Sequence, residues 1–541
     1  MRNHPKGLIA AALTNMGERF GFYIMMAILT LFISAQFGLS ETKTGFIYSA
    51  FYASIYVLAL VGGLIADKTR NYKGTILWGL IVMAIGYLVI AIPPIAATDI
   101  ANSSSFIMYL VLICFGLLII AFGNGLFKGN LQALVGQMYD KPDYKQSIID
   151  KYGVDENGKP KKDFRDTGYQ IFYMFINIGG FFAPWIAIAV RNWWLKHNGF
   201  DYNAQLPELC HQYINDATAM TAEQTANLTQ YSSDAVLNGT PIADMGSFCT
   251  EYLDVFNRGF QYAFFATVAA ILISVVIYLV NKYKFPDPAK IAPAKATDGQ
   301  TASASEVKMA ASEIRQRIYA LFAVFGIVIF FWFSFHQNGY SLTYFARDYI
   351  NLDIINLDLG FTSIKGAEIF QCVNPFFVVF LTPIIIWIFG ALRKKGKEPS
   401  TPKKIGIGMG IAALGYVFML LISTALPDKS ALSGMSEGAL SAMRLTPWVM
   451  VGMYFIMTVA ELFISPLGLS FVSKVAPPHL QGVMQGCWLA ATAVGNLLLF
   501  IGGLLYTAVP LWACWLVFVC ACGLSMIVML LMVKWLEKVA K

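Results

Sequence analysis

Two charged side chains within a long apolar segment are the first residues of this chain that could do chemistry. Glu18 and Arg19 lie between Gly7 and Leu39, where almost every other residue is compatible with lipid. A charge in hydrocarbon costs about 2.5–3.5 kcal/mol on insertion scales, so such residues usually face a polar cavity. One helical stripe beside Glu18 would hold four residues: Asn15, Arg19, Tyr23 and Met26. We expect this stripe to line a solute pathway; the alternative is a structural ion pair that fixes helix packing.

Two further ionisable residues interrupt apolar segments. Lys128 lies in the run Gly123–Asn130 of an apolar stretch, too far from its ends for easy snorkelling to the interface. Glu461 precedes Ser465-Pro466 and has no basic residue nearby in the sequence. An intramembrane ionisable residue is a functional candidate by default. We therefore expect a cavity-facing cation at Lys128 and a functional carboxylate at Glu461.

Uncharged polar residues extend this set, with less defined roles. Asn177 is surrounded by aromatic residues and glycines, so it could bind solute or hold two helices together. Asn374-Pro375 interrupts a helical hydrogen-bond ladder and can free a backbone carbonyl. His336 could titrate near neutral pH, or it could be a solvated histidine at the outer membrane interface.

The composition defines the elements that position these residues. The chain has 541 residues, of which 57% are hydrophobic and only 13% charged, and apolar runs of membrane-spanning length recur along it. The first run lacks a following cleavage site and is expected to be a retained helix. We predict an all-α polytopic membrane protein with twelve spanning helices, at 8–35, 45–66, 74–95, 105–136, 168–190, 259–282, 317–346, 364–391, 404–424, 446–474, 481–506 and 509–536.

The distribution of Lys and Arg predicts the topology. The 191–258 loop holds three basic and eight acidic residues, whereas six basic residues lie between Arg393 and Lys404. Basic residues are retained in the cytoplasm, so both termini are expected inside and the 191–258 loop outside. Cys210 and Cys249 share this outer loop, and we expect them to form a disulfide. The net charge of +7 thus reflects topology and not nucleic-acid binding.

The segment 283–316 is rich in Pro, Ala, Ser and Lys, and is predicted to be a cytoplasmic linker between two six-helix halves, 1–282 and 317–541. Two six-helix bundles are the layout of the major facilitator superfamily, which places its substrate site between the halves near the membrane midplane. The run Gly62–Lys68 resembles a loop motif of that superfamily. Its glycines would allow close helix packing, and Asp67 would latch the cytoplasmic side.

Taken together, these residues resemble the proton-dependent oligopeptide transporter family. The resemblance covers nearly the whole chain. It rests on Glu18-Arg19-Phe20 with Tyr23, Gly62–Asp67, Gly125–Asn130, Phe172-Tyr173-x-x-Ile176-Asn177-x-Gly179, Gln337, Asn374-Pro375, Glu461-x-x-x-Ser465-Pro466-x-Gly468-Leu469-Ser470 and Gly486-x-Trp488.

The resemblance implies a secondary transporter that imports di- and tripeptides by proton symport. Lys128 would face the peptide carboxylate and Glu461 the amino terminus, and a zwitterion indeed needs opposite charges on opposite walls of its cavity. The remaining implied substrate contacts are Tyr23, Asn177, Asn374 and Trp488. The implied partners are small peptides, protons and the lipid bilayer of a bacterial inner membrane, with no cofactor, metal or nucleic acid.

The chain also departs from the family pattern, which affects proton coupling. Asn15 replaces a glutamate, Met26 an arginine, His336 an acidic residue and Gly129 a proline. We expect Glu461 to carry the proton and His336 to serve as a gate, with Glu18, Arg19 and Asp67 also involved in coupling or gating. The alternative is a family member that moves another small solute, or peptides without protons. A membrane-embedded enzyme or sensor is disfavoured, because the sequence contains no catalytic cluster, nucleotide loop or large soluble domain.

Overall fold

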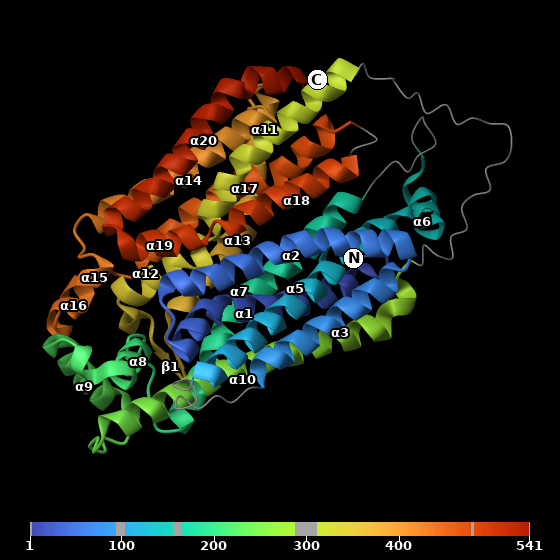
Figure 1. Ribbon diagram of the computed structural model, residues 1–541. Helices are drawn as coiled ribbons and strands as arrows, with labels where there is room; N and C mark the ends of the chain where they lie inside the picture. The colour runs from blue at the N-terminus through green and yellow to red at the C-terminus, as the bar shows by residue number, and fades with distance from the viewer. Residues whose placement is uncertain (1–2, 93–102, 155–163, 287–310, 478–480, 540–541) are drawn as a thin grey trace.

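The chain folds into long, closely packed helices in a computed structural model (Figure 1). The structure describes residues 3–92, 103–154, 164–286, 311–477 and 481–539. Within these residues, twelve helical segments are long and apolar enough to cross a membrane. They coincide with the twelve predicted spans, most of them within a few residues at each end, so the predicted fold class is confirmed.

The spanning helices form two bundles that are consecutive in the sequence. The first bundle contains α1 (Leu8–Phe37), α2 (Glu41–Thr69), α3 (Tyr72–Ala91), α5 (Ser103–Asp140), α7 (Arg165–His197) and α10 (Met245–Asn281). The second contains α11 (Ala311–Phe335), α12 (Ser341–Tyr349), α13 (Val373–Lys394), α14 (Thr401–Ser423), α17 (Trp448–Val475), α18 (Gln481–Leu497), α19 (Phe500–Ala508) and α20 (Leu511–Val539). Most of the predicted linker, residues 287–310, lies outside the described residues.

Glycines set the closest approach between α2 and α5. A Cβ atom on Gly62 would lie 2.1 Å from the carbonyl oxygen of Gly125, whereas a Cβ on the adjacent Gly63 would meet nothing within 4 Å. The side chain of Asn130 on α5 donates a hydrogen bond of 3.0 Å to the Gly62 carbonyl. Small residues therefore let the two backbones touch, as the Gly62–Lys68 run predicted.

The seventh and eleventh spans are broken, where we predicted continuous helices at 317–346 and 481–506. The turn η3 (His336–Gly339) separates α11 from α12, and α18 ends at Leu497 before α19 begins. The two breaks adjoin, because the Gln337 amide donates to the carbonyl of Leu499 at 3.3 Å. A polar side chain thus satisfies a backbone group that the interrupted ladder leaves unpaired.

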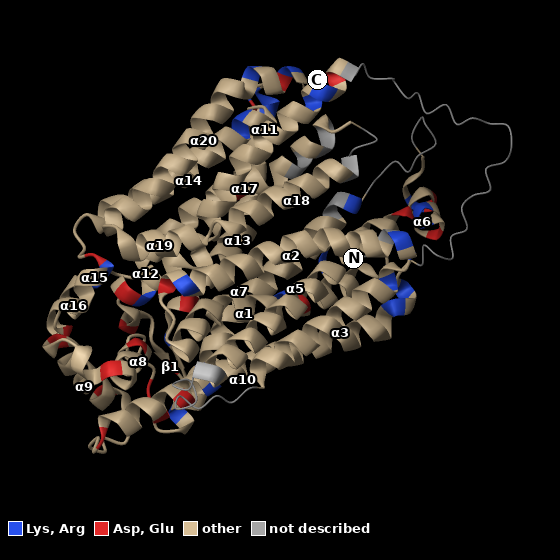
Figure 2. Cartoon of the chain, in the orientation of Figure 1, with Lys and Arg blue, Asp and Glu red and all other residues tan. Residues whose placement is uncertain are grey.

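The two ends of the bundle differ in structure and charge. One end, called the loop end here, carries short helices and a small hairpin: α8 (Leu206–Asp216), η1 (Ala217–Ala219), α9 (Ala222–Ala235), η4 (Leu352–Ile355), β1 (Leu357–Asp358), β2 (Ser363–Ile364), η5 (Ala367–Cys372), α15 (Lys429–Leu432) and α16 (Glu437–Met443). The opposite, terminal end carries both chain termini, α6 (Pro142–Tyr152) and η2 (Lys282–Lys284). Acidic residues gather at the loop end and basic residues at the terminal end (Figure 2).

The loop-end segment contains more helix than predicted, and it brings Cys210 and Cys249 together. The predicted loop 191–258 is largely helical, since α7 extends to His197 and α10 begins at Met245. Cys210 and Cys249 are in contact, as expected, but the structure contains them as free thiols and not as the expected disulfide. Burial raises the pKa of the Cys210 thiol well above its usual range, which disfavours the thiolate needed for oxidation. Their disulfide remains a prediction.

Candidate functional site

Glu18 and Arg19 on α1 pair with each other instead of facing an open pathway. The guanidinium donates two hydrogen bonds of 2.5 and 2.6 Å to the carboxylate. Asn124 on α5 donates a third to Glu18 at 2.9 Å. Glu18 is fully buried and Arg19 is 5% exposed. This geometry fits the structural alternative, an ion pair that joins α1 to α5, and the predicted role of the pair in coupling or gating stays a prediction.

Lys128 on α5 has a different environment. Its ammonium group lies 4.7 Å from the centre of the Tyr56 ring on α2, within the range of a cation–π contact. The side chain is only partly buried. It forms no ion pair with any residue that the structure describes. The first bundle therefore presents a cation whose charge no described acidic residue pairs with.

Glu461 on α17 is the corresponding anion of the second bundle. Asn374 on α13 donates a hydrogen bond of 2.9 Å to its carboxylate and a second, of 3.0 Å, to the Thr458 hydroxyl. Among the described residues, Glu461 likewise has no cationic partner. It is close enough to interact electrostatically with three tyrosines of the first bundle, Tyr23, Tyr56 and Tyr173. Glu461 therefore lies within electrostatic range of the opposite half, including Tyr56, whose ring Lys128 contacts.

The other predicted substrate residues differ in how close they lie to the junction of the two halves. A Cβ atom added to Gly180 on α7 would lie 3.1 Å from the Tyr23 ring on α1 and 3.1 Å from Pro375 on α13. The three helices therefore meet at Gly180. The Asn177 amide donates to the Tyr173 carbonyl of its own helix at 3.0 Å. Trp488 is buried against Gly468 within the second bundle. Tyr23 thus lies at the junction of the halves, whereas the substrate contacts of Asn177 and Trp488 remain predictions.

A row of tyrosines at this junction was missed by the sequence analysis. Tyr48, Tyr52 and Tyr56 follow each other at four-residue spacing on α2, with ring centres 5.7 and 6.1 Å apart. Tyr173 on α7 is 50% exposed. Repeated tyrosines on one face of a membrane helix were a usable signal, because a buried hydroxyl requires a polar partner.

His336 joins the same row from the second half. It is 5% exposed, and its Nδ1 atom lies 2.5 Å from the Oδ1 atom of Asn496. Its ring stacks on Trp332 at 4.9 Å and contacts Tyr52 at 4.5 Å. The alternative of a solvated interfacial histidine is therefore wrong. Asp67 lies on α2, but its side chain is outside the described residues.

Ion pairs close the junction at the loop end. Arg191 on α7 and Glu368 in η5 form a fully buried pair across the halves. Arg347 on α12 binds Glu41 on α2 at 2.8 Å. Every ion pair between described residues of the first and second halves lies at this end. The halves are thus fastened at the loop end, beyond Lys128 and Glu461.

Comparison with solved structures identifies the fold as that of the major facilitator superfamily. The crystal structure of peptide transporter POT in complex with sulfate superposes with a TM-score of 0.68 at 21% identity, covering 99% of this chain and 96% of that one. The sequence profile of the POT family matches residues 73–297 and 289–511. The chain belongs to the POT family, whose members are transporters and not enzymes.

Two relatives from bacteria are similar over most of the chain. Peptide transporter YePEPT of Yersinia enterocolitica is 27% identical over 510 residues, covering 91% of this chain and 86% of its own length. Dipeptide and tripeptide permease B of Xenorhabdus bovienii is 26% identical over 503 residues, covering 92% and 86%. The chain is an integral membrane transporter of the same family.

Proposed function

We propose that this protein imports di- and tripeptides by proton symport, through alternating access of a site between its two halves. The observation that carries this proposal is the pair Lys128 and Glu461. One charge comes from each half, Lys128 contacts Tyr56, Glu461 lies within electrostatic range of the same ring, and neither charge has an oppositely charged partner among the described residues. A zwitterionic peptide would supply both missing partners, with its carboxylate at Lys128 and its ammonium at Glu461.

The distribution of contacts between the halves supports alternating access. Hydrogen bonds and ion pairs join the halves at the loop end, as between Arg347 and Glu41. Between described residues, no ion pair joins them at the terminal end. A peptide that bridges Lys128 and Glu461 would draw the halves together on the terminal-end side of the site. It would so favour the state that is closed at the terminal end and open at the loop end.

The charge distribution supports the proposed orientation in a bacterial inner membrane. Basic residues gather around the terminal end and acidic residues around the loop end (Figure 2). By the positive-inside rule, the terminal end would face the cytoplasm and the loop end the outside. The structure would then represent the state closed to the outside.

The first test measures which end of a peptide each charge recognises. Lys128→Ala should weaken transport of dialanine but not of its analogue with an amidated carboxyl terminus. Glu461→Gln should weaken dialanine but spare the analogue with a blocked amino terminus. Removing one partner of a buried charge pair costs about 2–5 kcal/mol, so each effect should exceed roughly tenfold in competition assays with labelled peptide. Equal losses for all three ligands in both variants would exclude this recognition mode.

A second candidate function keeps the fold and changes the coupling or the solute. Asn15 cannot titrate and Met26 carries no charge. His336 contacts Asn496 and aromatic rings instead of an acid–base partner. These features favour a family member that carries another small solute, or peptides without protons. Uptake of labelled dialanine into liposomes, with and without an imposed pH gradient, separates the two candidates.

A further inference from the structure

The segment 198–244, which we call the outer segment, contacts both halves of the molecule. It contains α8 and α9 and connects α7 to α10 of the first bundle. The His211 Nε2 atom donates a 2.6 Å hydrogen bond to the Ala35 carbonyl at the end of α1. The Tyr252 hydroxyl of α10 donates to the carbonyl of Asp201 at 3.2 Å. The outer segment is thus fixed to the first half of the transporter.

The same segment reaches across the junction to the second half. Its target is the α15–α16 segment, residues 428–444, which connects α14 to α17. Asn227 on α9 donates to the Met435 carbonyl at 2.8 Å, and the Tyr231 hydroxyl donates to the Glu437 carboxylate. Both α9 side chains are buried in this contact. Two loops that are far apart in the sequence therefore bind each other over the loop end.

Charged groups add to this contact. Lys429 of α15 lies 3.3 Å from Glu208 of α8 and 3.2 Å from Asp348 at the end of α12. Although burial opposes its charge, the neighbouring carboxylates of Asp348 and Glu208 raise the pKa of Lys429 above its usual range. Lys429 therefore stays charged at neutral pH and joins Glu208 of the outer segment to Asp348 of the second half.

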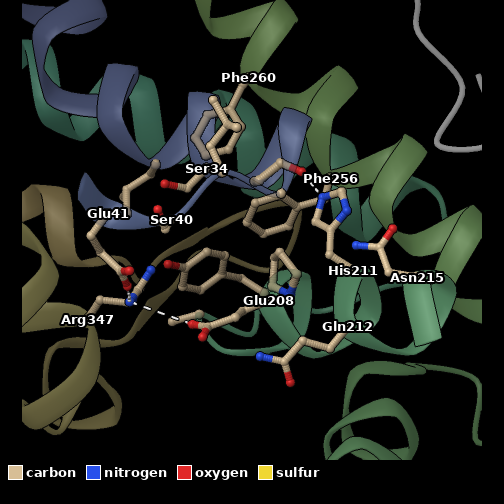
Figure 3. A pocket seen from close by; sticks show the side chains of 17 residues that line it. Ser34, Ser40, Glu41, Glu208, His211, Gln212, Asn215, Phe256, Phe260 and Arg347 are labelled. Atoms are coloured by element: carbon tan, nitrogen blue, oxygen red, sulfur yellow. Dashed lines mark hydrogen bonds and ion pairs between the residues drawn. The ribbon is translucent and has the colours of Figure 1, made fainter. Parts of the chain in front are cut away.

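The outer segment also covers the ion pair that fastens the bundles. Glu208 and Glu41 converge on Arg347 at one wall of a cavity of about 250 Å³, and His211 and Gln212 line it from α8 (Figure 3). The Gln205 amide donates to the Arg347 carbonyl at 3.0 Å. If the halves separate at the loop end, these contacts must break together with those of α9.

We propose that the outer segment is a clasp that holds the loop end closed and sets how often the transporter opens on that side. The inference rests on the alternating access proposed above. Each crossing hydrogen bond stabilises the closed state relative to the open one, in which the same groups are hydrated. Loosening the clasp should therefore shift the population toward loop-end opening without touching Lys128 or Glu461.

The test compares two double variants on the same helix. Asn227→Ala with Tyr231→Phe removes two crossing hydrogen bonds. The control, Thr225→Ala with Thr229→Ala, removes hydroxyls whose hydrogen bonds, of 3.1 and 2.9 Å, go to Thr221 and Thr225 within the same turns. Both variants remove two polar groups of α9, and only the groups of the first variant cross to the second half. Asn227 and Tyr231 are buried in that contact, whereas Thr225 and Thr229 are exposed.

The readout is the labelling rate of Cys372, which needs no transport and no gradient. This thiol is 6% exposed and lies beside Trp185 of α7, at the junction that opens when the halves separate. We expect a soluble maleimide to label Cys372 about tenfold faster in the clasp variant than in wild type or the control, followed by peptide mapping. Equal rates in the three proteins overturn the proposal. Because labelling does not depend on a solute, failure of the proposed peptide function would leave this result readable.

A locked variant covers the case in which the clasp variant unfolds. Labelling of Cys522, which is fully buried within the second bundle, reports such unfolding. Asn227→Cys with Met435→Cys places one thiol on each residue of the crossing contact, in which the Asn227 side chain reaches the backbone carbonyl of Met435. Oxidation should slow Cys372 labelling severalfold, and a reductant should restore it. Unchanged labelling on oxidation, with the cross-link verified by mass spectrometry, also overturns the proposal.

Discussion

The four charged residues that apolar sequence segments singled out divide into two kinds by their partners. Glu18 and Arg19 satisfy each other and leave no charge for a solute. Lys128 and Glu461 have no charged partner among the described residues, although each is held by a neutral group. A buried charge that the protein does not compensate is costly. Lys128 and Glu461 are only partly buried, so each bears part of this cost, whereas the fully paired Glu18 and Arg19 contribute to the packing of α1 on α5.

This difference predicts opposite effects on stability. Glu18→Gln would leave the Arg19 guanidinium buried without its anion, which typically costs about 3–5 kcal/mol. We expect a large fall in the melting temperature of the detergent-solubilised protein, followed by intrinsic tryptophan fluorescence. Glu461→Gln removes an anion that has no cationic partner in the protein and should leave the melting temperature nearly unchanged. If the Glu18→Gln protein is as stable as wild type, the structural role of Glu18 is excluded, and the alternative that Glu18 lines the solute pathway is favoured.

The sequence predicted the functional importance of Lys128 and Glu461, but it predicted few of the residues around them. Lys128, Glu461 and Asn374 are unusual in apolar segments, so each was detectable by its cost in lipid. The contact of Asn374 with Glu461 agrees with the implied site. Helical spacing predicted that Glu18 lies beside the stripe that contains Arg19. It could not show that the two adjacent side chains form an ion pair. The tyrosine row on α2 was missed because tyrosine is compatible with membrane helices and was not counted as polar.

At the scale of elements, small residues decide how closely α2 and α5 pack. A Cβ on Gly62 would clash with the Gly125 backbone, which cannot move aside like a flexible side chain. Gly62→Ala should therefore destabilise the protein by about 1–3 kcal/mol, the usual range for overpacking. The matched control is Gly63→Ala, whose added methyl group meets open space and improves helix propensity by up to about 1 kcal/mol. Thermal unfolding of both variants checks this; equal stabilities would mean that the two helices can separate without cost.

Elements differ in how well the sequence predicted them, for physical reasons. The twelve spans were predictable because a hydrocarbon core demands about twenty apolar residues in succession. The breaks at His336–Gly339 and after Leu497 were not, since they depend on the Gln337 side chain meeting a carbonyl 162 residues away. The short helices α8 and α9 were also missed, because polar, amphipathic segments of this length are stabilised by tertiary contacts and not by propensity alone.

At the scale of the whole molecule, the proposed alternating-access cycle connects the closure at the loop end with Lys128 and Glu461, which have no oppositely charged partner among the described residues. The loop-end ion pairs fix the halves on one side of the junction, and the outer segment adds contacts from α9 to residues 428–444. The central charges have no such fixed partner. A solute that satisfies both can therefore alter the balance between the two closed states, whereas the loop-end contacts set the starting point of that balance.

Proton coupling requires one group in this cycle to exchange a proton as the solute binds or the halves move. Arg19 keeps its charge, Asn15 has none to lose, and Glu18 is paired with Arg19. The candidates that remain are Glu461, His336 and, as the least favoured, Lys128. Because glutamine cannot take up a proton, Glu461→Gln should abolish accumulation of dialanine driven by a pH gradient, while exchange of solute across liposomes partly survives. His336→Gln should shift the pH optimum of uptake without abolishing accumulation. Transport by the wild-type protein that ignores both the pH gradient and the membrane potential would exclude coupling, and the uncoupled carrier would then be the function of this fold.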